Sequence, residues 1–341
     1  MNPPFIIAEI GVNHDGNVSK AKKLILEAKA CGASAVKFQS FSAENLASIN
    51  TPKVEYQKKR DSFTSHFEML KSLELSYEEQ ENLQKFSLQN AIEFMSTPYS
   101  CDQAEFLESL GVEKFKTASA DIVDIPLHKK IASFKKLTFI STGMSSIEEI
   151  DLVSKIYIQE SCPFVLMHAT SEYPCPIEFA NLRKLENLRN LGSIGLGFSD
   201  HTRGSVAAVV AVGMGCSVFE KHFTLHCDDL GPDHSASADP QEFRSYVNEI
   251  NFAWKSLGSD KAQMSSAESE MSQVSRKSVC YSKDFEKGDT VTLEDLKLIR
   301  PGTGVSWWTA EQMLPATLTT SVRANEQLKP SDFNFLASKK L

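Results

Sequence analysis

The sequence predicts a (β/α)8 TIM barrel followed by a small second domain. From residue 5 to about 258, eight short β-rich apolar runs alternate with longer segments whose apolar residues recur every three or four positions. Nearly every run ends in a polar or ionisable residue, as barrel strands do when their carboxyl ends build an active site. The 341 residues suit a barrel of about 250 residues plus an appendage. A doubly wound open sheet, which also places ligands at carboxyl strand ends, is the alternative fold.

The strands expected in chain order are FIIAEIG, AVKFQS, IEFMSTP, KFKTAS, LTFISTG, FVLMHAT, IGLGFSD and SVFEKHF. Helical spacing fills stretches between them, such as Ser19 to Cys31, Tyr77 to Asn90, Ser146 to Gln159 and Arg203 to Gly215. Residues 1–258 are therefore expected to form the barrel. Residues 259–277, rich in Ser and charge, are expected to be a linker. Residues 278–335, with short β-like pieces beside the EKGD and RPGTG turns, are expected to form the small, mainly β domain.

Composition narrows the class of protein. Hydrophobic residues at 41% and charged residues at 23% are ordinary globular values, and the net charge of -8 argues against nucleic-acid or anionic-membrane partners. The seven cysteines are scattered without CxxC spacing, which favours free thiols in a reducing cytoplasm. Neither a signal peptide nor a run of about 20 apolar residues is visible. We expect a soluble cytoplasmic protein.

Two histidines, His201 in GFSDHT and His222 in FEKHFT, lie at the ends of successive expected strands. A lone histidine is more often a core or rim residue than a ligand, but two that converge favour a shared divalent metal. Without a nearby Cys or a fixed carboxylate, the site would be open and partly hydrated. Such a metal polarises a carbonyl group.

Two lysines, Lys37 in VKFQ and Lys116 in FKTAS, lie within apolar strand text, where an unpaired ammonium is costly to bury. A structural ion pair or a stem that snorkels to the rim would explain either one alone. An anion pocket explains both, because a phosphate or carboxylate needs several convergent donors. The other expected donors are Gln39, Ser119, Ser141 and Ser199.

Four further residues have two explanations each. Glu9 could transfer protons beside a metal or simply pair with a lysine. Asp233, in LGPDHSAS, could face the barrel mouth or form a turn, and Asp121 could contact a polyol or cap a helix. Tyr173, in SEYPCP, could pack against a sugar or brace its loop.

The ordered motifs AEIGVNHDG, VKFQSF, FMSTP, STGM, EYPCP, GFSDHT, EKHFTL and GPDHSAS closely resemble the sialic acid synthase family, which includes N-acetylneuraminate, legionaminate and pseudaminate synthases. The segment SVCYSKDFEKGDTVTLEDLKLIRPGTG resembles the antifreeze-like (SAF) domain of that family. The resemblance implies condensation of phosphoenolpyruvate with the open aldehyde form of an N-acetylated amino sugar. The products would be a nine-carbon 2-keto acid and inorganic phosphate.

The resemblance also implies roles for individual residues. His201 and His222 would hold Mn²⁺ or Mg²⁺, and Glu9 would assist proton transfer during phosphate loss. Phosphoenolpyruvate would be bound by Lys37, Gln39, Lys116, Ser119, Ser141 and Ser199. The amino sugar would contact Asp121, Tyr173 and Asp233, together with Arg300 of the SAF domain, donated by the partner in a domain-swapped homodimer. In a monomer Arg300 would be an ordinary surface residue before a turn.

Departures from the family pattern concern the sugar. The chain has Ser119-Ala120-Asp121 where the family commonly has Ser-Gly-Glu, and Ser171 where some members have asparagine. N-acetylmannosamine, its 6-phosphate and a 2,4-diacetamido-trideoxyhexose therefore all stay open as acceptors, with the phosphorylated sugar less favoured by the acidic net charge. Two other classes also stay open: a non-catalytic sugar-binding protein on the same scaffold, and a metal-dependent aldolase that uses pyruvate. A binding protein has no need of a metal site and a phosphate pocket together, and the aldolase would need no phosphate site.

Overall fold

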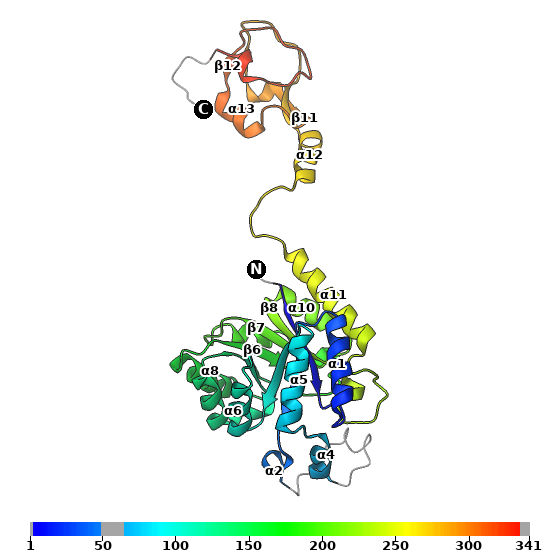
Figure 1. Cartoon of the computed structure of the whole chain (residues 1–341). Helices are drawn as coiled ribbons and strands as arrows, with labels where there is room; N and C mark the ends of the chain where they lie inside the picture. The colour runs from blue at the N-terminus through cyan, green and yellow to red at the C-terminus, as the bar shows by residue number, and fades with distance from the viewer. Residues whose placement is uncertain (1–2, 49–64, 335–341) are drawn as a thin grey trace. The chain divides into compact units, whose positions relative to one another are not determined.

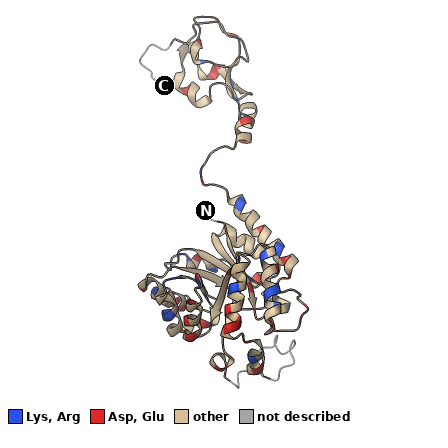
Figure 2. Ribbon diagram, in the orientation of Figure 1, with Lys and Arg blue, Asp and Glu red and all other residues tan. Residues whose placement is uncertain are grey.

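The computed structural model describes residues 3–48 and 65–334, and the chain divides into two compact units, Met1–Gly258 and Ser259–Leu341 (Figure 1). Residue 335, the expected end of the second domain, lies outside the described residues. Both signs of charge are interspersed over the outer helices of the first unit (Figure 2). Among the described residues, no helix combines the length and the apolar character needed to cross a bilayer. All seven cysteines are free thiols.

The first unit is a barrel of eight parallel strands, as the sequence predicts. The strands are β1 (Phe5–Gly11), β2 (Ala35–Ser40), β3 (Glu93–Pro98), β4 (Lys114–Thr117), β5 (Leu137–Ser141), β6 (Phe164–Ala169), β7 (Leu196–Asp200) and β8 (Cys216–His222). The ladder runs β3-β2-β1-β8-β7-β6-β5-β4, and β3 also contacts β4, so the two ends of the ladder meet. An open, doubly wound sheet is therefore the wrong alternative.

Helices connect the strands, and most of them cover the outside of the barrel (Figure 1). They are α1 (Val18–Ala30), α2 (Ala43–Leu46), α4 (His66–Leu73), α5 (Tyr77–Gln89), α6 (Cys101–Ser109), α7 (Ile125–Ser133), α8 (Ile147–Gln159), α9 (Lys184–Leu188), α10 (Val206–Gly213) and α11 (Pro240–Leu257). Local sequence fixes several of their starts. Ser76 and Ser146 form capping boxes with Glu79 and Glu149 at the first turns of α5 and α8.

Alternation along the strands decides where the site lies. Successive side chains of a strand point to opposite faces, so every second residue faces the barrel interior. One interior layer is apolar: Ile7, Ala35, Met95, Phe139, Val165, Met167 and Val218. In five of these strands, the residue two positions after the apolar one is polar and faces the same interior. These residues are Glu9, Lys37, Thr97, Ser141 and Glu220. The apolar layer therefore closes the barrel beneath a polar layer.

A β-bulge interrupts the pairing of β7 with β8. Cys216 pairs with Leu196, but Gly197 pairs with Val218, so Ser217 is an extra residue. Cys216 packs in the outer core, whereas Val218 packs inside the barrel. After the bulge, Glu220 and His222 face the interior. Lys221 faces outward, where its Nζ lies 4.9 Å from the centre of the Tyr246 ring on α11.

The second unit is small and has its own apolar core, which includes Val279, Tyr281 and Leu328. Its strands pair antiparallel, β9 (Ser278–Tyr281) with β11 (Leu296–Ile299), and β10 (Thr290–Val291) with β12 (Ala316–Thr317). It also contains the helix α13 (Trp307–Met313).

One difference from expectation lies at the start of this unit. Helix α12 (Ser266–Ser275) occupies part of the segment expected to be a linker. A capping box between Ser265 and Glu268 starts this helix, which has no buried residue. Strong local capping therefore forms a helix here without a core to pack on.

Candidate active site

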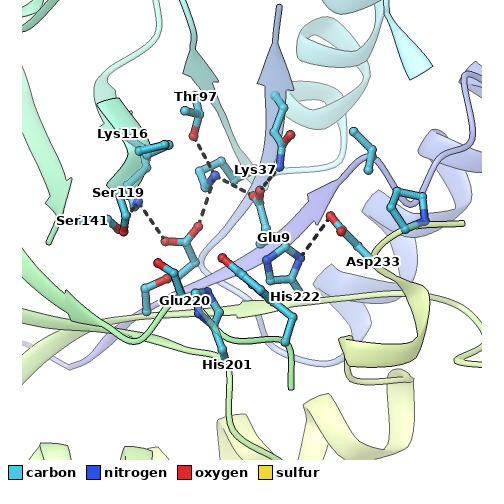
Figure 3. Close-up of a pocket in the computed structure, with 18 of the residues that line it drawn as sticks. Glu9, Lys37, Thr97, Lys116, Ser119, Ser141, His201, Glu220, His222 and Asp233 are labelled. Carbon is cyan, nitrogen blue, oxygen red and sulfur yellow. Dashed lines mark hydrogen bonds and ion pairs between the residues drawn. The ribbon is translucent and has the colours of Figure 1, made fainter. Parts of the chain in front are cut away.

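A cavity of about 380 Å³ opens at the carboxyl ends of the strands (Figure 3). Eleven of the thirteen candidate residues line it: Glu9, Lys37, Gln39, Lys116, Ser119, Ser141, Tyr173, Ser199, His201, His222 and Asp233. Asp121 and Arg300 are not among its lining residues. Asp121 lies two residues beyond Ser119, in the 3-10 helix η1 (Ser119–Val123), and Arg300 is an exposed residue of the second unit.

The floor of the cavity is a buried group of two lysines and two glutamates (Figure 3). Lys37 Nζ lies 2.7 Å from Glu9 Oε2 and 3.2 Å from Glu220 Oε1. Lys116 Nζ lies 3.3 Å from Glu220 Oε2. Two ammonium groups are thus held together by two carboxylates, so this group of four side chains is close to neutral before any ligand arrives.

Glu220 is a cavity residue that the sequence argument missed. It lines the pocket and is 5% exposed, so its charge must be compensated locally. The signal was present in the sequence: Glu220 stands two residues before His222, on the same face of an alternating strand. Two buried lysines require such a partner.

The buried, charged surroundings shift the pKa of all four of these side chains. Burial raises the pKa of Glu9, helped by the nearby Glu220 charge and opposed by Lys37. Burial also acts on Glu220, but Lys116 and Lys37 outweigh it and lower the pKa of that carboxyl. Burial lowers the pKa of Lys116, whereas at Lys37 the two glutamates outweigh burial and raise the pKa. Glu9 is therefore the carboxyl that most readily takes up a proton.

Hydroxyl groups surround the two ammonium groups. Lys37 donates to Thr97 Oγ1 at 2.8 Å, and Lys116 donates to Ser141 Oγ at 2.5 Å. Ser119 Oγ accepts a hydrogen bond from the backbone N–H of Gly143 at 3.0 Å. A Cβ on Gly143 would lie 2.5 Å from Ser171 Oγ, so only glycine lets these loops meet here.

The two histidine rings lie side by side, with centroids 5.7 Å apart. His201 Nδ1 lies 2.7 Å from the carbonyl oxygen of Thr170; because a carbonyl can only accept, Nδ1 carries the hydrogen and Nε2 is left with its lone pair. Burial and the neighbouring His222 lower the pKa of His201 to about 3, so its ring is neutral at pH 7. Tyr173 covers this ring, with centroids 4.1 Å apart.

His222 presents Nδ1 as a buried nitrogen that makes no hydrogen bond, with Asp233 Oδ2 3.8 Å away. Across residues 3–48 and 65–334, no three His, Cys, Asp or Glu side chains are placed to ligate one metal ion. Two neighbouring imidazoles, one of them neutral and one with a free buried nitrogen, fit an open site whose other ligands are water or substrate.

Asp121 is a partly buried residue that is not among those lining the cavity. Its Oδ2 is buried and has no hydrogen-bond partner. Burial and the nearby Asp124 raise its pKa to about 6. The helix cap at this place is Asp124, whose side chain accepts from the Leu127 N–H at the start of α7, so the capping explanation for Asp121 is wrong.

One wall of the cavity is apolar, which the sequence argument did not anticipate. Met69, Leu70 and Leu73 of α4 line it together with Val12. All four are buried in one small cluster. Helix α4 lies between the second and third strands, and its apolar residues gave no sign in the sequence that they would face the site rather than the core.

The family, the curated proteins and the solved structure to which this chain is similar all indicate the same kind of protein. Residues 24–262 match the model of the NeuB family. The chain is 40% identical, over 95% of its length and 93% of the other protein, to the N,N'-diacetyllegionaminic acid synthase of Legionella pneumophila. Identity to the enzyme of the same name from Campylobacter jejuni is 35%, over 96% of this chain and all of that one.

A solved structure is also similar, that of the N-acetylneuraminic acid synthetase from Leptospira borgpetersenii in complex with citrate. The TM-score is 0.72 at 32% identity. The match covers 79% of this chain and 90% of the other.

Proposed function

This chain belongs to the NeuB family, and from that premise we propose that it condenses phosphoenolpyruvate with the open-chain aldehyde of an N-acetylated amino sugar. A carbon–carbon bond forms between C3 of phosphoenolpyruvate and the aldehyde carbon. One water molecule is consumed, and a nine-carbon 2-keto acid and inorganic phosphate are released. The observation that carries the proposal is the pair of buried lysines beside a pair of histidines in one cavity.

The lysine floor suits a small polyanion. Lys37 and Lys116 supply cationic donors, and Ser119, Ser141, Ser199 and Gln39 supply neutral polar groups around them. Because Glu220 already contacts both ammonium groups, the lysines are in place before the substrate binds. Such preorganisation reduces the cost of ordering the site on binding.

Glu9 is the proposed proton-transfer group. Its raised pKa suits a carboxyl that gains and loses a proton during turnover. Gln39 donates to Glu9 Oε1 at 3.1 Å and fixes the orientation of the carboxyl group. Phosphate loss requires a proton at the leaving oxygen, and Glu9 lies at the floor where the phosphate would be held.

His201 and His222 are the proposed ligands of a divalent cation. Bound Mn²⁺ or Mg²⁺ would act as a Lewis acid on the aldehyde oxygen. The hydrogen bond from His201 Nδ1 to Thr170 fixes the ring so that Nε2 is the nitrogen available for ligation.

The proposed acceptor is a 2,4-diacetamido-2,4,6-trideoxyhexose. The apolar wall of Val12, Met69, Leu70 and Leu73 favours a C6 methyl over a hydroxymethyl or phosphate group. Asp121 Oδ2 and Ser171 Oγ are buried polar atoms without hydrogen-bond partners, and an additional acetamido group offers both a donor and an acceptor. Two relatives named as diacetyllegionaminic acid synthases support the same choice.

A phosphorylated sugar fits less well. Among the described residues lining the cavity, Lys37 and Lys116 are the only lysine or arginine side chains, and both are already engaged with carboxylates. A second phosphate would therefore be buried without a cation of its own.

Phosphate release over a panel of sugars tests the proposal, with phosphoenolpyruvate held constant. We expect the diacetamido-trideoxyhexose to exceed N-acetylmannosamine, and N-acetylmannosamine 6-phosphate to react least. Met69→Gln keeps the side-chain length but adds polar atoms, so the preference for the 6-deoxy sugar should fall about tenfold. Met264→Gln, at an exposed methionine of the second unit, is the matched control.

Two outcomes would support the alternative functions. Turnover of pyruvate in place of phosphoenolpyruvate would indicate an aldolase, and no turnover of any sugar would favour a binding protein.

We further propose a cytoplasmic domain-swapped homodimer in which residues 278–335 form a SAF domain and Arg300 reaches the partner's cavity. The seven free thiols support a reducing compartment. The segment 259–277 is long enough to span tens of ångströms, even with α12 helical. Arg300 would recognise an N-acetyl carbonyl of the sugar.

A further inference from the structure

We propose that Asp15 and His234 are positioning residues for the sugar half of the site. Together they join the loop after β1 to the loop after β8, and so hold the Asp233 carboxylate beside His222. The inference rests on the proposed function, in which Asp233 contacts the amino sugar. Neither Asp15 nor His234 lines the cavity, so each acts through its neighbour rather than on the substrate.

His234 is a fully buried loop residue with both ring nitrogens engaged. Its Nε2 lies 3.1 Å from Asp15 Oδ1, and its Nδ1 lies 2.6 Å from Thr224 Oγ1. Because an ionised carboxylate can only accept, Nε2 carries a hydrogen and donates to Asp15. The residue next to Asp233 is thereby tied across 219 positions of sequence to the first loop of the barrel.

A second set of contacts holds the other side of Asp233. Asn13, fully buried in the same first loop, donates to the Phe223 carbonyl at 3.0 Å and to Ser237 Oγ at 2.8 Å. Ser237 Oγ in turn donates to the Asp233 carbonyl oxygen at 2.7 Å. Asp233 therefore lies between two anchors that both lead to residues 13–15.

The two loops also approach too closely for a side chain. Gly231 has φ +151°, and a Cβ there would lie 2.7 Å from His234 Cδ2 and 3.2 Å from Asp15 Oδ1. The glycine lets the loop fold flat against the contact between Asp15 and His234.

Asp15 is held in turn by Lys20 of helix α1. Lys20 Nζ lies 2.6 Å from Asp15 Oδ2 and 2.7 Å from Asp229 Oδ2. Although burial acts to raise it, the hydrogen bonds from His234 and Lys20 lower the pKa of Asp15, so it stays ionised and keeps accepting from His234.

The position of Asp233 matters because its Oδ2 lies 3.8 Å from His222 Nδ1, at the rim where the aldehyde end of the sugar would lie. The segment between β8 and α11 contains the short 3-10 helix η3 (His234–Ala236) and an isolated bridge between Phe223 and Ala238 at its ends, so little regular structure fixes the part around Asp233. A shift of about 1 Å at a reacting centre can cost about 100-fold in rate. Side-chain contacts with the first loop supply the rigidity that secondary structure does not.

The test uses the full chain and three substitutions: Asp15→Ala, Asp15→Asn and the control Tyr157→Phe. Tyr157 OH lies 3.2 Å from Nδ1 of buried His128, between α7 and α8, so the control also removes a buried hydrogen bond to a histidine, but away from the cavity. We expect Asp15→Ala to raise the KM for the sugar about tenfold and to leave the KM for phosphoenolpyruvate within about twofold. Asp15→Asn, which keeps an acceptor oxygen, should recover most of the loss, and Tyr157→Phe should change neither KM.

Two further measurements separate positioning from general stability. In an Asp233→Ala background, adding Asp15→Ala should change the sugar KM by less than about twofold, because the residue through which Asp15 acts is absent. Amide hydrogen exchange over residues 223–237 should be faster in Asp15→Ala and unchanged in Tyr157→Phe. This exchange measurement does not depend on turnover, so it tests the joined loops even if the sugar assignment is wrong.

Three results would overturn the inference: equal increases in both KM values, full additivity with Asp233→Ala, or unchanged exchange over residues 223–237. A wild-type enzyme that releases no phosphate with any sugar would instead count against the proposed function alone.

Discussion

The ammonium of Lys37 lies 2.7 Å from Oε2 of Glu9, and both side chains are only 3% exposed. A buried ion pair is usually weak evidence for stability, because removing two charges from water costs about as much as their attraction returns. Here Lys37 also contacts Glu220, so Glu9 shares this ammonium with a second carboxylate. Glu9 is the less completely compensated of the two, which is why its pKa rises while that of Glu220 falls.

Glu9→Gln should reduce kcat about 100-fold to 10,000-fold, because the variant keeps the shape and the contact with Gln39 but cannot transfer a proton. Both KM values should stay within a few fold. Steady-state phosphate release measures these constants. Glu93→Gln is the control, since Glu93 pairs with Lys114 at 2.8 Å at the opposite end of the strands. A variant that keeps wild-type kcat would exclude Glu9 from proton transfer.

His222→Ala should abolish turnover and weaken Mn²⁺ binding while the fold is retained. Removing one of two imidazoles leaves a single protein ligand at an open site. Isothermal titration with Mn²⁺ measures the affinity directly, and activity is assayed after chelation and manganese addition. His226→Ala, at an exposed histidine four residues further along, should leave both properties unchanged. Full activity of His222→Ala in that assay would refute the metal assignment.

Arg300→Ala should raise the KM for the amino sugar at least about tenfold and leave that for phosphoenolpyruvate nearly unchanged, because a lost hydrogen bond from a charged donor costs about 1.5–3 kcal/mol. Arg323→Ala, another exposed arginine of the second unit, is the control. Equal effects on the two substrates would argue against a sugar contact. A chain that is monomeric in sedimentation and still fully active would argue against the swapped arrangement.

Asp121→Asn should stabilise the protein at high pH but not at low pH. The pKa of Asp121 is about 6 in the folded chain, above the ordinary value of 3.8, so the folded state binds a proton more tightly than the unfolded state. The stability from this group is fully present below pH 3.8 and is lost as pH rises through about 6. The asparagine side chain does not ionise, so the free energy of unfolding of the variant should exceed that of the wild type by a margin that grows to at most about 3 kcal/mol by pH 8.

Thermal unfolding at pH 4 and pH 8 measures this difference. Asp260→Asn, at an exposed carboxylate, should show no comparable pH dependence. An Asp121→Asn advantage that is the same at both pH values would show that ionisation of Asp121 does not limit stability.

Much of the site follows from strand alternation, which explains why sequence reasoning reached it. Lys37 and His222 interrupt apolar strands on the interior face, so their convergence could be expected from the barrel alone. Glu220 could have been found by the same alternation together with the need for a counter-charge. Alternation counted from Cys216 would place Glu220 on the outer face of the barrel, and only the bulge at Ser217 turns it inward.

Other parts depend on contacts that no local pattern encodes. Asp121 does not line the cavity, and Asp124, not Asp121, caps helix α7; the sequence offers both aspartates and does not distinguish them. The apolar wall comes from α4, whose buried residues have the same spacing whether they face a core or a substrate. The joining of Asp15 to His234 spans almost the whole barrel sequence and could be recognised only in three dimensions.

The extra residue at Ser217 has a consequence for how the enzyme could change. Upstream of it, β8 turns Cys216 toward the helices; downstream, it turns Glu220 and His222 toward the cavity. Deleting that one residue would join Cys216 directly to Val218, which already pair with consecutive residues of β7, so the bulge would disappear while Glu220 and His222 stayed on the cavity side. Strand β8 can therefore lose a residue at this one position without moving its catalytic end, whereas in a regular strand the loss of any residue turns every side chain beyond it to the opposite face.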